Sequence, residues 1–320
     1  MPLLPAEASA PGSLMLMGEH AVLRGQPAIV CAIDRRITAT LQPLPGDAIR
    51  LHSALGEHET TLSELAPDDT FRFVLAAIRR LRDRLPGGFS LDIRSRMSHQ
   101  MGLGSSAAVT VAAWGALLAA LGDTPDPAAV TEDAIALIRK VQGGVGSGAD
   151  VAASVHGGCL RYFAEPRECV KLSAVPDLTV LYSGSKMPTP EVIALVEEKR
   201  RLHEDIFDDI DALIGKTVQE AFSAAAAEDW ETMGELMNVN QGLMDALGVN
   251  DATLSRLVYA LRDDPRILGA KISGSGLGDC VVGLGRAMRT DWNVPSLGVK
   301  IDPDGLKTRI LPPDAEEAAP

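Results

Sequence analysis

Apolar and polar positions along the chain follow the repeats of both strands and helices. Apolar or alternating runs predict strands in five segments: Leu14–Leu16, Ala28–Ile33, Ile37–Leu41, Leu178–Tyr182 and Gly269–Gly285, the last also containing a glycine-rich loop. Helical spacing predicts eight helices: Phe71–Leu85, Ala107–Leu121, Thr131–Val141, Ala149–Val155, about Thr189 to Arg201, Ile206–Ala227, Trp230–Leu247 and Ala252–Asp263. The Ala107–Leu121 helix carries few charges and is expected to be buried.

The length of 320 residues is enough for two domains, at roughly 150 residues each. No fixed-period repeat and no Pro- or Ser-rich linker divides the chain, so the two parts are expected to share an interface. A soft boundary falls near Ser183–Pro190, between a predicted strand and a predicted helix. We predict one domain over residues 1–185 and another over 186–320.

Charge and cysteine content narrow the function classes. The net charge of −13 argues against nonspecific binding to nucleic acid or to an anionic membrane, because either partner would be repelled. The four cysteines are scattered, which argues against a zinc site and against a disulfide framework. The N-terminus has no signal-peptide pattern, and no uncharged apolar run approaches the ~18 residues of a membrane span. A cytoplasmic location is expected.

The strongest chemical signal is a loop of small residues, Gly102–Ala108, that opens directly onto a predicted helix. Glycines let the backbone approach a ligand closely, and the first N–H groups of a helix have no intrahelical partner. With the positive end of the helix dipole, this arrangement suits a phosphate group. Ser105 or Ser106 could cap the helix or reach a Mg²⁺ ion. A tight turn into a helix, without any ligand, fits the spacing equally well.

Two further segments of small residues could carry chemistry. Asp150 lies within Gly146–Ser154, where a carboxylate is costly to bury without a partner, so it is either a helix cap or a catalytic base. Lys271–Asp279 is a strand that leads into a GxGxG loop, a pattern that ordinary β-turns also produce.

Together these loops resemble the motifs of a known family, the GHMP kinases. Ala10–Gly25 resembles the first motif of the family, and its Gly18–Val22 stretch (Gly-Glu-His-Ala-Val) is closest to mevalonate kinases. Gly102–Ala108 resembles the second, ATP-phosphate motif, and Gly269–Gly278 resembles the third. The three motifs occur in family order, and the resemblance covers most of the chain.

The resemblance implies an α+β fold of two domains. The N-terminal α/β domain would be similar to ribosomal protein S5 domain 2, and the C-terminal domain would be α+β. ATP would bind through its phosphates to Gly102, Leu103, Gly104, Ser105, Ser106 and Ala107, with Ser106 also contacting Mg²⁺. Asp150 matches the catalytic aspartate, which would accept the proton of the substrate hydroxyl. The substrate would contact Ser13, Glu19, His20, Thr189, Gly274 and Ser275. A homodimer is also expected.

The chain departs from the family pattern at several positions. Ser13 replaces a lysine that is assigned to the hydroxyl or to the γ-phosphate, and Arg139 stands where mevalonate kinases carry a Mg²⁺-binding glutamate. Ser98–Met101 replaces the usual Pro-x-Gly-x. Gln142–Asp150 resembles the corresponding segment of phosphomevalonate kinases more than that of mevalonate kinases.

The resemblance therefore favours phosphorylation of mevalonate to 5-phosphomevalonate, with alternatives. A phosphomevalonate kinase would need extra cations in its pocket, for which the candidates are Arg24, Arg35, Arg36, Arg139, Lys140 and Lys186. A sugar or homoserine kinase has no motif of its own in the sequence. A catalytically silent, ligand-sensing relative is the remaining alternative, based on Ser13 and Arg139.

Overall fold

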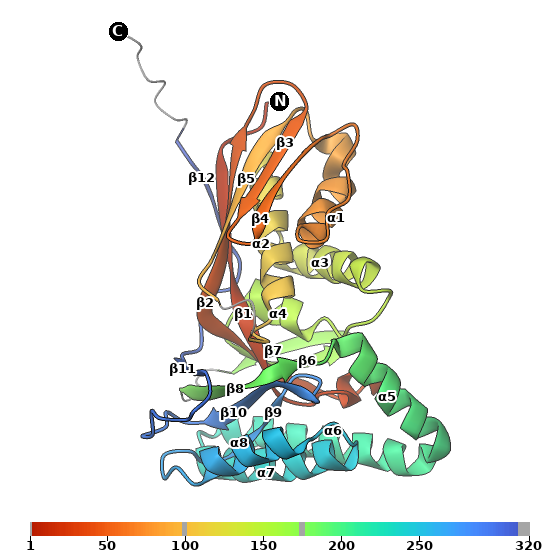
Figure 1. Ribbon diagram of the computed structural model, residues 1–320, viewed down its shortest axis with the longest axis vertical. Coiled ribbons are helices and arrows are strands. Elements are labelled where there is room, and N and C mark those ends of the chain that lie inside the picture. The colour runs from red at the N-terminus through yellow and green to blue at the C-terminus, as the bar shows by residue number, and fades with distance from the viewer. Residues whose placement is uncertain (1, 98–100, 173–176, 313–320) are drawn as a thin grey trace.

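The computed structural model describes residues 2–97, 101–172 and 177–312. These residues form two β-sheets, and helices pack on one face of each (Figure 1). The larger sheet contains β1 (Ala6–Met17), β2 (Ala28–Pro43), β3 (Ala48–Ser53), β4 (Gly56–Thr61), β5 (Phe89–Ser95), β6 (Cys159–Ala164), β7 (Arg167–Leu172) and β12 (Lys307–Ile310). Its order is β12-β1-β2-β5-β3-β4, and β6 joins β2 and β7 at one end. Every pair is antiparallel except β3 with β5.

The two longest strands reach further than the sequence pattern predicted. Ala28–Ile33 and Ile37–Leu41 are parts of the single strand β2. Leu14–Leu16 is only the end of β1, which begins at Ala6 among small residues. That first half is buried because a helix packs closely on it, and a Cβ added at Gly115 of this helix would lie 3.2 Å from the Ala8 Cβ. The first half of β1 was not predicted because it lacks large apolar side chains.

Helices α1 (Arg72–Leu81), α2 (Ser105–Ala120), α3 (Pro127–Val141) and α4 (Ala149–His156) cover one face of the larger sheet (Figure 1). The alanine-rich helix α2 is buried at its centre, as its lack of charges predicted. Helix α1 buries one apolar side, and Arg79 and Arg80 lie exposed on the other. Short 3₁₀ turns occur at η1 (Ala21–Arg24) and η2 (Arg82–Arg84).

The smaller sheet has the antiparallel order β11-β8-β10-β9. Its strands are β8 (Leu178–Lys186), β9 (Ala270–Ser273), β10 (Gly278–Leu284) and β11 (Ser296–Val299). Helices α6 (Glu204–Ala226), α7 (Trp230–Ala246) and α8 (Ala252–Arg262) lie below it in Figure 1, and α5 (Thr189–Leu202) connects β8 to them. Each predicted helix appears within a few residues of its expected bounds.

Strand β8, which ends at Lys186, belongs to the smaller sheet, and β12 returns from the C-terminal part of the chain to pair with β1. The domain boundary between residues 185 and 186 stays a prediction. Across the described residues, no helix combines the length and the apolar character that crossing a membrane requires.

Candidate active site

A cleft of about 720 Å³ brings the three small-residue loops together. Its walls come from the end of β1, the starts of α2, α4 and α5, and the loop between β9 and β10. Every predicted site residue except Leu103 lines it: Ser13, Glu19, His20, Gly102, Gly104, Ser105, Ser106, Ala107, Asp150, Thr189, Gly274 and Ser275. Leu103 is fully buried, so its side chain belongs to the core.

The 102–108 loop ends at Gly104, which occupies the N-cap position of α2 with φ at 66°. No side chain caps this helix, so the capping alternative for Ser105 and Ser106 is wrong. The first backbone N–H groups of α2 are therefore left for another partner. Both serines line the cleft at this helix start.

The glycines of this loop make room for other side chains. A Cβ at Gly104 would lie 1.9 Å from the Ser13 hydroxyl oxygen. A Cβ at Gly102 would lie 1.9 Å from an oxygen of Asp279. The sequence suggested that these glycines admit a ligand, whereas the structure shows that each first admits a protein side chain. Asp279 ends the Lys271–Asp279 segment, but no local pattern in the sequence indicated its contact with Gly102.

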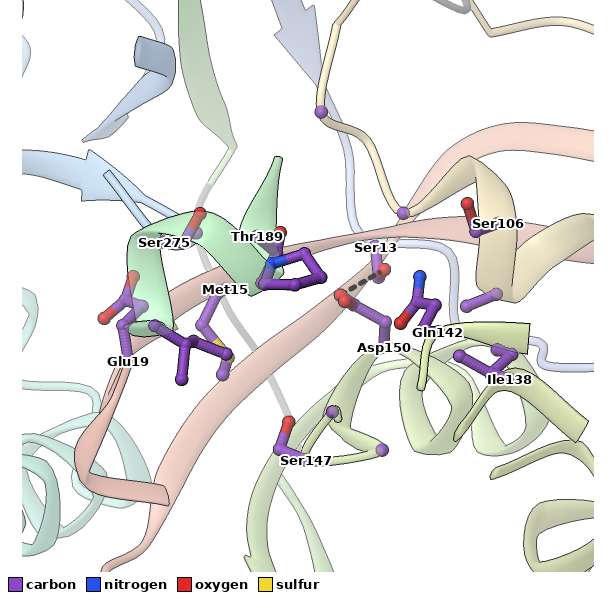
Figure 2. A pocket seen from close by; sticks show the side chains of 18 of the residues that line it. Ser13, Met15, Glu19, Ser106, Ile138, Gln142, Ser147, Asp150, Thr189 and Ser275 are labelled. Atoms are coloured by element: carbon purple, nitrogen blue, oxygen red, sulfur yellow. Dashed lines mark hydrogen bonds between the residues drawn. The ribbon is translucent and has the colours of Figure 1, made fainter. Parts of the chain in front are cut away.

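Asp150 is the second residue of α4, and Gly148 holds the N-cap position with φ at 87°. The helix-cap interpretation of Asp150 is therefore wrong. The Ser13 hydroxyl donates a hydrogen bond of 2.7 Å to Asp150 Oδ1 (Figure 2). Burial raises the pKa of Asp150, and this hydrogen bond and the charge of Lys186 partly oppose the rise. Asp150 nevertheless lines the cleft, so its carboxylate is a proton acceptor that a ligand can reach.

Ser13 joins two of the motifs. It lies buried on β1, and its backbone N–H donates a 3.0 Å hydrogen bond to the carbonyl oxygen of Leu103. Because its hydroxyl holds Asp150, the side chain fixes the carboxylate relative to the 102–108 loop. The spacing of the sequence gave no sign of this contact, which spans 137 residues.

A buried ion pair lies at another part of the cleft. Lys271 Nζ is 2.6 Å from Glu19 Oε1, and the exposed fractions of the two side chains are 0% and 3%. Burial lowers the pKa of Lys271, and the charge of Glu19 opposes this effect. Glu19 Oε2 has no hydrogen-bond partner within the described part of the chain. The pair ties the turn after β1 to strand β9 of the smaller sheet.

His20 follows Glu19 with a positive φ of 62°. Its Nε2 atom lies 2.9 Å from the carbonyl oxygen of Ser275, in the loop after β9. Burial lowers the pKa of His20, which keeps the imidazole neutral near pH 7. A neutral ring can donate from Nε2 to that carbonyl.

Lys186 and Asp279 form a second ion pair, this one at the surface of the cleft. Lys186 Nζ lies 2.9 Å from Asp279 Oδ2, with the lysine side chain 45% exposed. The Gly102 N–H donates a 2.7 Å hydrogen bond to the other oxygen of Asp279. These two contacts of Asp279 connect the end of β8, the start of β10 and the 102–108 loop.

A metal ion would find few protein ligands. Arg139, which stands at the position of a family glutamate, donates from Nε to the Gly146 carbonyl oxygen at 2.9 Å and so supports the loop before α4. Within residues 2–97, 101–172 and 177–312, no cluster of three or more His, Cys, Asp and Glu side chains could hold a metal ion. The Ser106 hydroxyl and the Asp150 carboxylate both face the cleft. This pair fits Mg²⁺, which keeps several waters and binds phosphate oxygens.

The Ser98–Met101 departure from the family pattern falls mainly on residues 98–100, which lie outside the described residues.

The chain matches the GHMP kinases N terminal domain over residues 72–158 and the GHMP kinases C terminal domain over residues 221–289. It is 35% identical over 306 residues to the mevalonate kinase of Thermococcus onnurineus (strain NA1), covering 87% of this chain and 88% of that one. The mevalonate kinase of Pyrococcus furiosus is 33% identical over 330 residues, covering 94% and 97%.

The crystal structure of the Methanococcus jannaschii mevalonate kinase superposes with a TM-score of 0.78 at 23% identity, covering 92% of this chain and 98% of that one. This likeness confirms the predicted fold. The 35% identity extends over most of both chains, so this chain belongs to the mevalonate kinase family of GHMP kinases.

Proposed function

We propose that this chain transfers the γ-phosphoryl group of ATP to the 5-hydroxyl group of mevalonate, giving 5-phosphomevalonate and ADP. The observation that carries the proposal is the position of Asp150, whose carboxylate is held by Ser13 and faces the cleft beside the start of α2. The kinship to mevalonate kinases supplies the acceptor.

The two ends of the cleft suit the two substrates. In Figure 2, Ser106 lies to one side of the Ser13–Asp150 pair, whereas Glu19, Thr189 and Ser275 lie to the other. ATP phosphates would bind the N–H groups of residues 102–107 at the start of α2, where the helix dipole attracts negative charge. Mg²⁺, bound with ATP and held by Ser106, would neutralise phosphate charge there.

Asp150 would orient the acceptor hydroxyl and take its proton as the new bond forms. The raised pKa brings the carboxyl group closer to the working pH of a general base than an exposed aspartate would be. Ser13 keeps the carboxylate pointed into the cleft by donating to one of its oxygens. Phosphoryl transfer requires little beyond such alignment and charge neutralisation.

On the acceptor side, the substrate would contact Ser13, Glu19, His20, Thr189, Gly274 and Ser275. Glu19 Oε2 is buried and has no hydrogen-bond partner among the residues that the structure describes, so it offers an acceptor to a substrate hydroxyl. Its charge is compensated by Lys271, which fixes the carboxylate without blocking this oxygen.

The arrangement of cations favours mevalonate over a phosphorylated acceptor. Six cationic residues were candidates for a second phosphate, and Lys186 is the one among them that lines the cleft. Arg24 pairs with Glu197, Arg36 pairs with Asp302, and Arg139 binds a backbone carbonyl. Arg72 is the other cationic side chain that lines the cleft among the described residues, so an acceptor phosphate would meet few compensating charges.

The arrangement also disfavours a silent, ligand-sensing role. Such a protein has no need for a carboxylate that is both held by a hydrogen bond and open to the cleft. The homodimer and the cytoplasmic location stay predictions.

The test is a coupled ADP-release assay with MgATP and a panel of acceptors: mevalonate, 5-phosphomevalonate, sugars and amino-alcohols. We expect turnover on mevalonate, and a loss of about 10²–10⁴-fold in kcat for Asp150→Asn with ATP binding retained. Turnover only on 5-phosphomevalonate would contradict the proposed acceptor. Near-normal turnover of Asp150→Asn would remove Asp150 from the mechanism.

A further inference from the structure

We propose that Lys186 is a catalytic residue of this site: its ammonium group contacts the phosphoryl group during transfer. This inference rests on the proposed function and adds a cation to it. Lys186 is the last residue of β8, and it lines the same cleft as Ser13, Gly102 and Asp150.

The charge balance of the cleft calls for such a group. Glu19, Asp150 and Asp279 already place three carboxylates there, of which Glu19 is paired with Lys271, and a bound triphosphate adds further negative charge. Among the cleft-lining residues that the structure describes, the side chains with a permanent positive charge are Arg72 and Lys186. Lys186 is the one whose charge acts on Asp150 and lowers its pKa. Its ammonium group also pairs with Asp279, whose other oxygen accepts from the Gly102 N–H, so it lies beside the loop to which the phosphates are expected to bind.

Asp279 acts as the positioning residue for Lys186. A lysine has a long, flexible stem, so its ammonium group needs a fixed partner to be held in one place. Asp279 provides one oxygen to Lys186 at 2.9 Å and the other to the Gly102 N–H at 2.7 Å. Asp279 is 9% exposed and has a positive φ of 68°, a conformation that non-glycine residues seldom adopt. Through Asp279, the position of the Lys186 ammonium group is fixed relative to Gly102, the first residue of the 102–108 loop.

The transfer step balances without any further reactant. The bond from the acceptor oxygen to the γ-phosphorus forms, and the bond from that phosphorus to the β–γ bridging oxygen breaks. The bridging oxygen keeps the electron pair and leaves on ADP, while the acceptor proton passes to Asp150. Lys186 keeps its proton throughout and stabilises the charge on the phosphoryl oxygens.

The first experiment measures nucleotide affinity in the absence of an acceptor, by titration calorimetry of the full chain with Mg²⁺. ADP lacks the γ-phosphate, whereas the β,γ-imido analogue of ATP carries it. We expect Lys186→Met to weaken binding of the imido analogue by about tenfold and to leave ADP affinity within about twofold. The control is Lys216→Met, an exposed lysine of α6 outside the cleft, which should change neither affinity.

The second experiment measures turnover on mevalonate. We expect Lys186→Met to lower kcat by about 100-fold with little change in the KM for mevalonate, and Lys186→Arg to recover part of the loss because it keeps the charge. An unchanged ratio of the two nucleotide affinities, together with a kcat within threefold of wild type, would overturn the proposal. If the wild type fails on every acceptor, the proposed function fails, and the affinity ratio still decides whether Lys186 meets the γ-phosphate.

Asp279→Asn tests the positioning role. The amide keeps an oxygen for the Gly102 N–H but loses the charge that holds Lys186. We expect this change to lower the ratio of imido-analogue to ADP affinity in the wild type and to have no further effect in the Lys186→Met background, as coupled residues require. Equal effects in both backgrounds would show that Asp279 acts independently of Lys186.

Discussion

The buried pair of Glu19 and Lys271 allows a quantitative prediction about stability. Lys271→Met replaces the ammonium group with an apolar side chain of similar length and leaves the Glu19 carboxylate with no compensating charge. Breaking a buried pair in this way typically costs about 3–5 kcal/mol. Both side chains are almost fully enclosed, at 0% and 3% exposure, so solvent screening offers little relief.

Protonation of Glu19 in the variant sets an upper limit on that cost. A glutamate in the unfolded chain ionises near pH 4.3, so keeping this carboxyl protonated at pH 7 requires about 3.7 kcal/mol. The expected loss of unfolding free energy at pH 7 is therefore about 3–4 kcal/mol. Because the protonation cost falls with pH, the loss should shrink by about 1.4 kcal/mol for each unit between pH 7 and pH 5.

The assay is urea unfolding of wild type and variant, followed by circular dichroism at pH 7, 6 and 5. The matched control is the double variant Glu19→Gln with Lys271→Met, which removes both charges and should recover most of the loss. A loss below about 1 kcal/mol at pH 7, or one that does not change with pH, would refute the reasoning. It would show that water reaches Glu19 in the variant.

Two further predictions concern the contacts of Ser13. Ser13→Ala removes the hydrogen bond that opposes the rise in the Asp150 pKa, so the acid limb of the pH profile of kcat/KM should move to higher pH. A pH–rate profile whose acid limb does not move would show that Ser13 does not affect the pKa of Asp150. Gly104→Ala adds a Cβ 1.9 Å from the Ser13 hydroxyl at a φ of 66°, so it should cost at least about 1–2 kcal/mol of backbone strain and lower kcat by displacing Ser13. Urea unfolding and the coupled assay measure both effects, with Gly122→Ala, at a φ of 82° in open space, as the control for strain alone.

The helices were predictable because their signal is local. Apolar residues at helical spacing predicted each helix on its own, without reference to the rest of the chain. Strands were harder, because β1 begins with small residues and β3 to β7 carry mixed faces that become intelligible only beside a partner strand. Burial in a sheet depends on which helix covers it, and the sequence pattern does not contain that information.

The same division applies to the site. The small-residue loops, the helix start at residue 105 and the candidate base Asp150 could be identified from the sequence, because each is a local pattern with a defined chemistry. The sequence also revealed that Ser13 and Arg139 depart from the family, without indicating what these side chains do instead.

Only the tertiary structure determined which residues contact one another in the site. Ser13 meets Asp150 across 137 residues, Lys271 meets Glu19 across 252, and the Gly102 N–H meets Asp279 across 177. Such contacts depend on how the two sheets are brought together, and the spacing of residues within one segment does not predict that arrangement. The sequence thus determines which chemical groups the site contains, whereas the fold determines how these groups are aligned and how their charges are balanced.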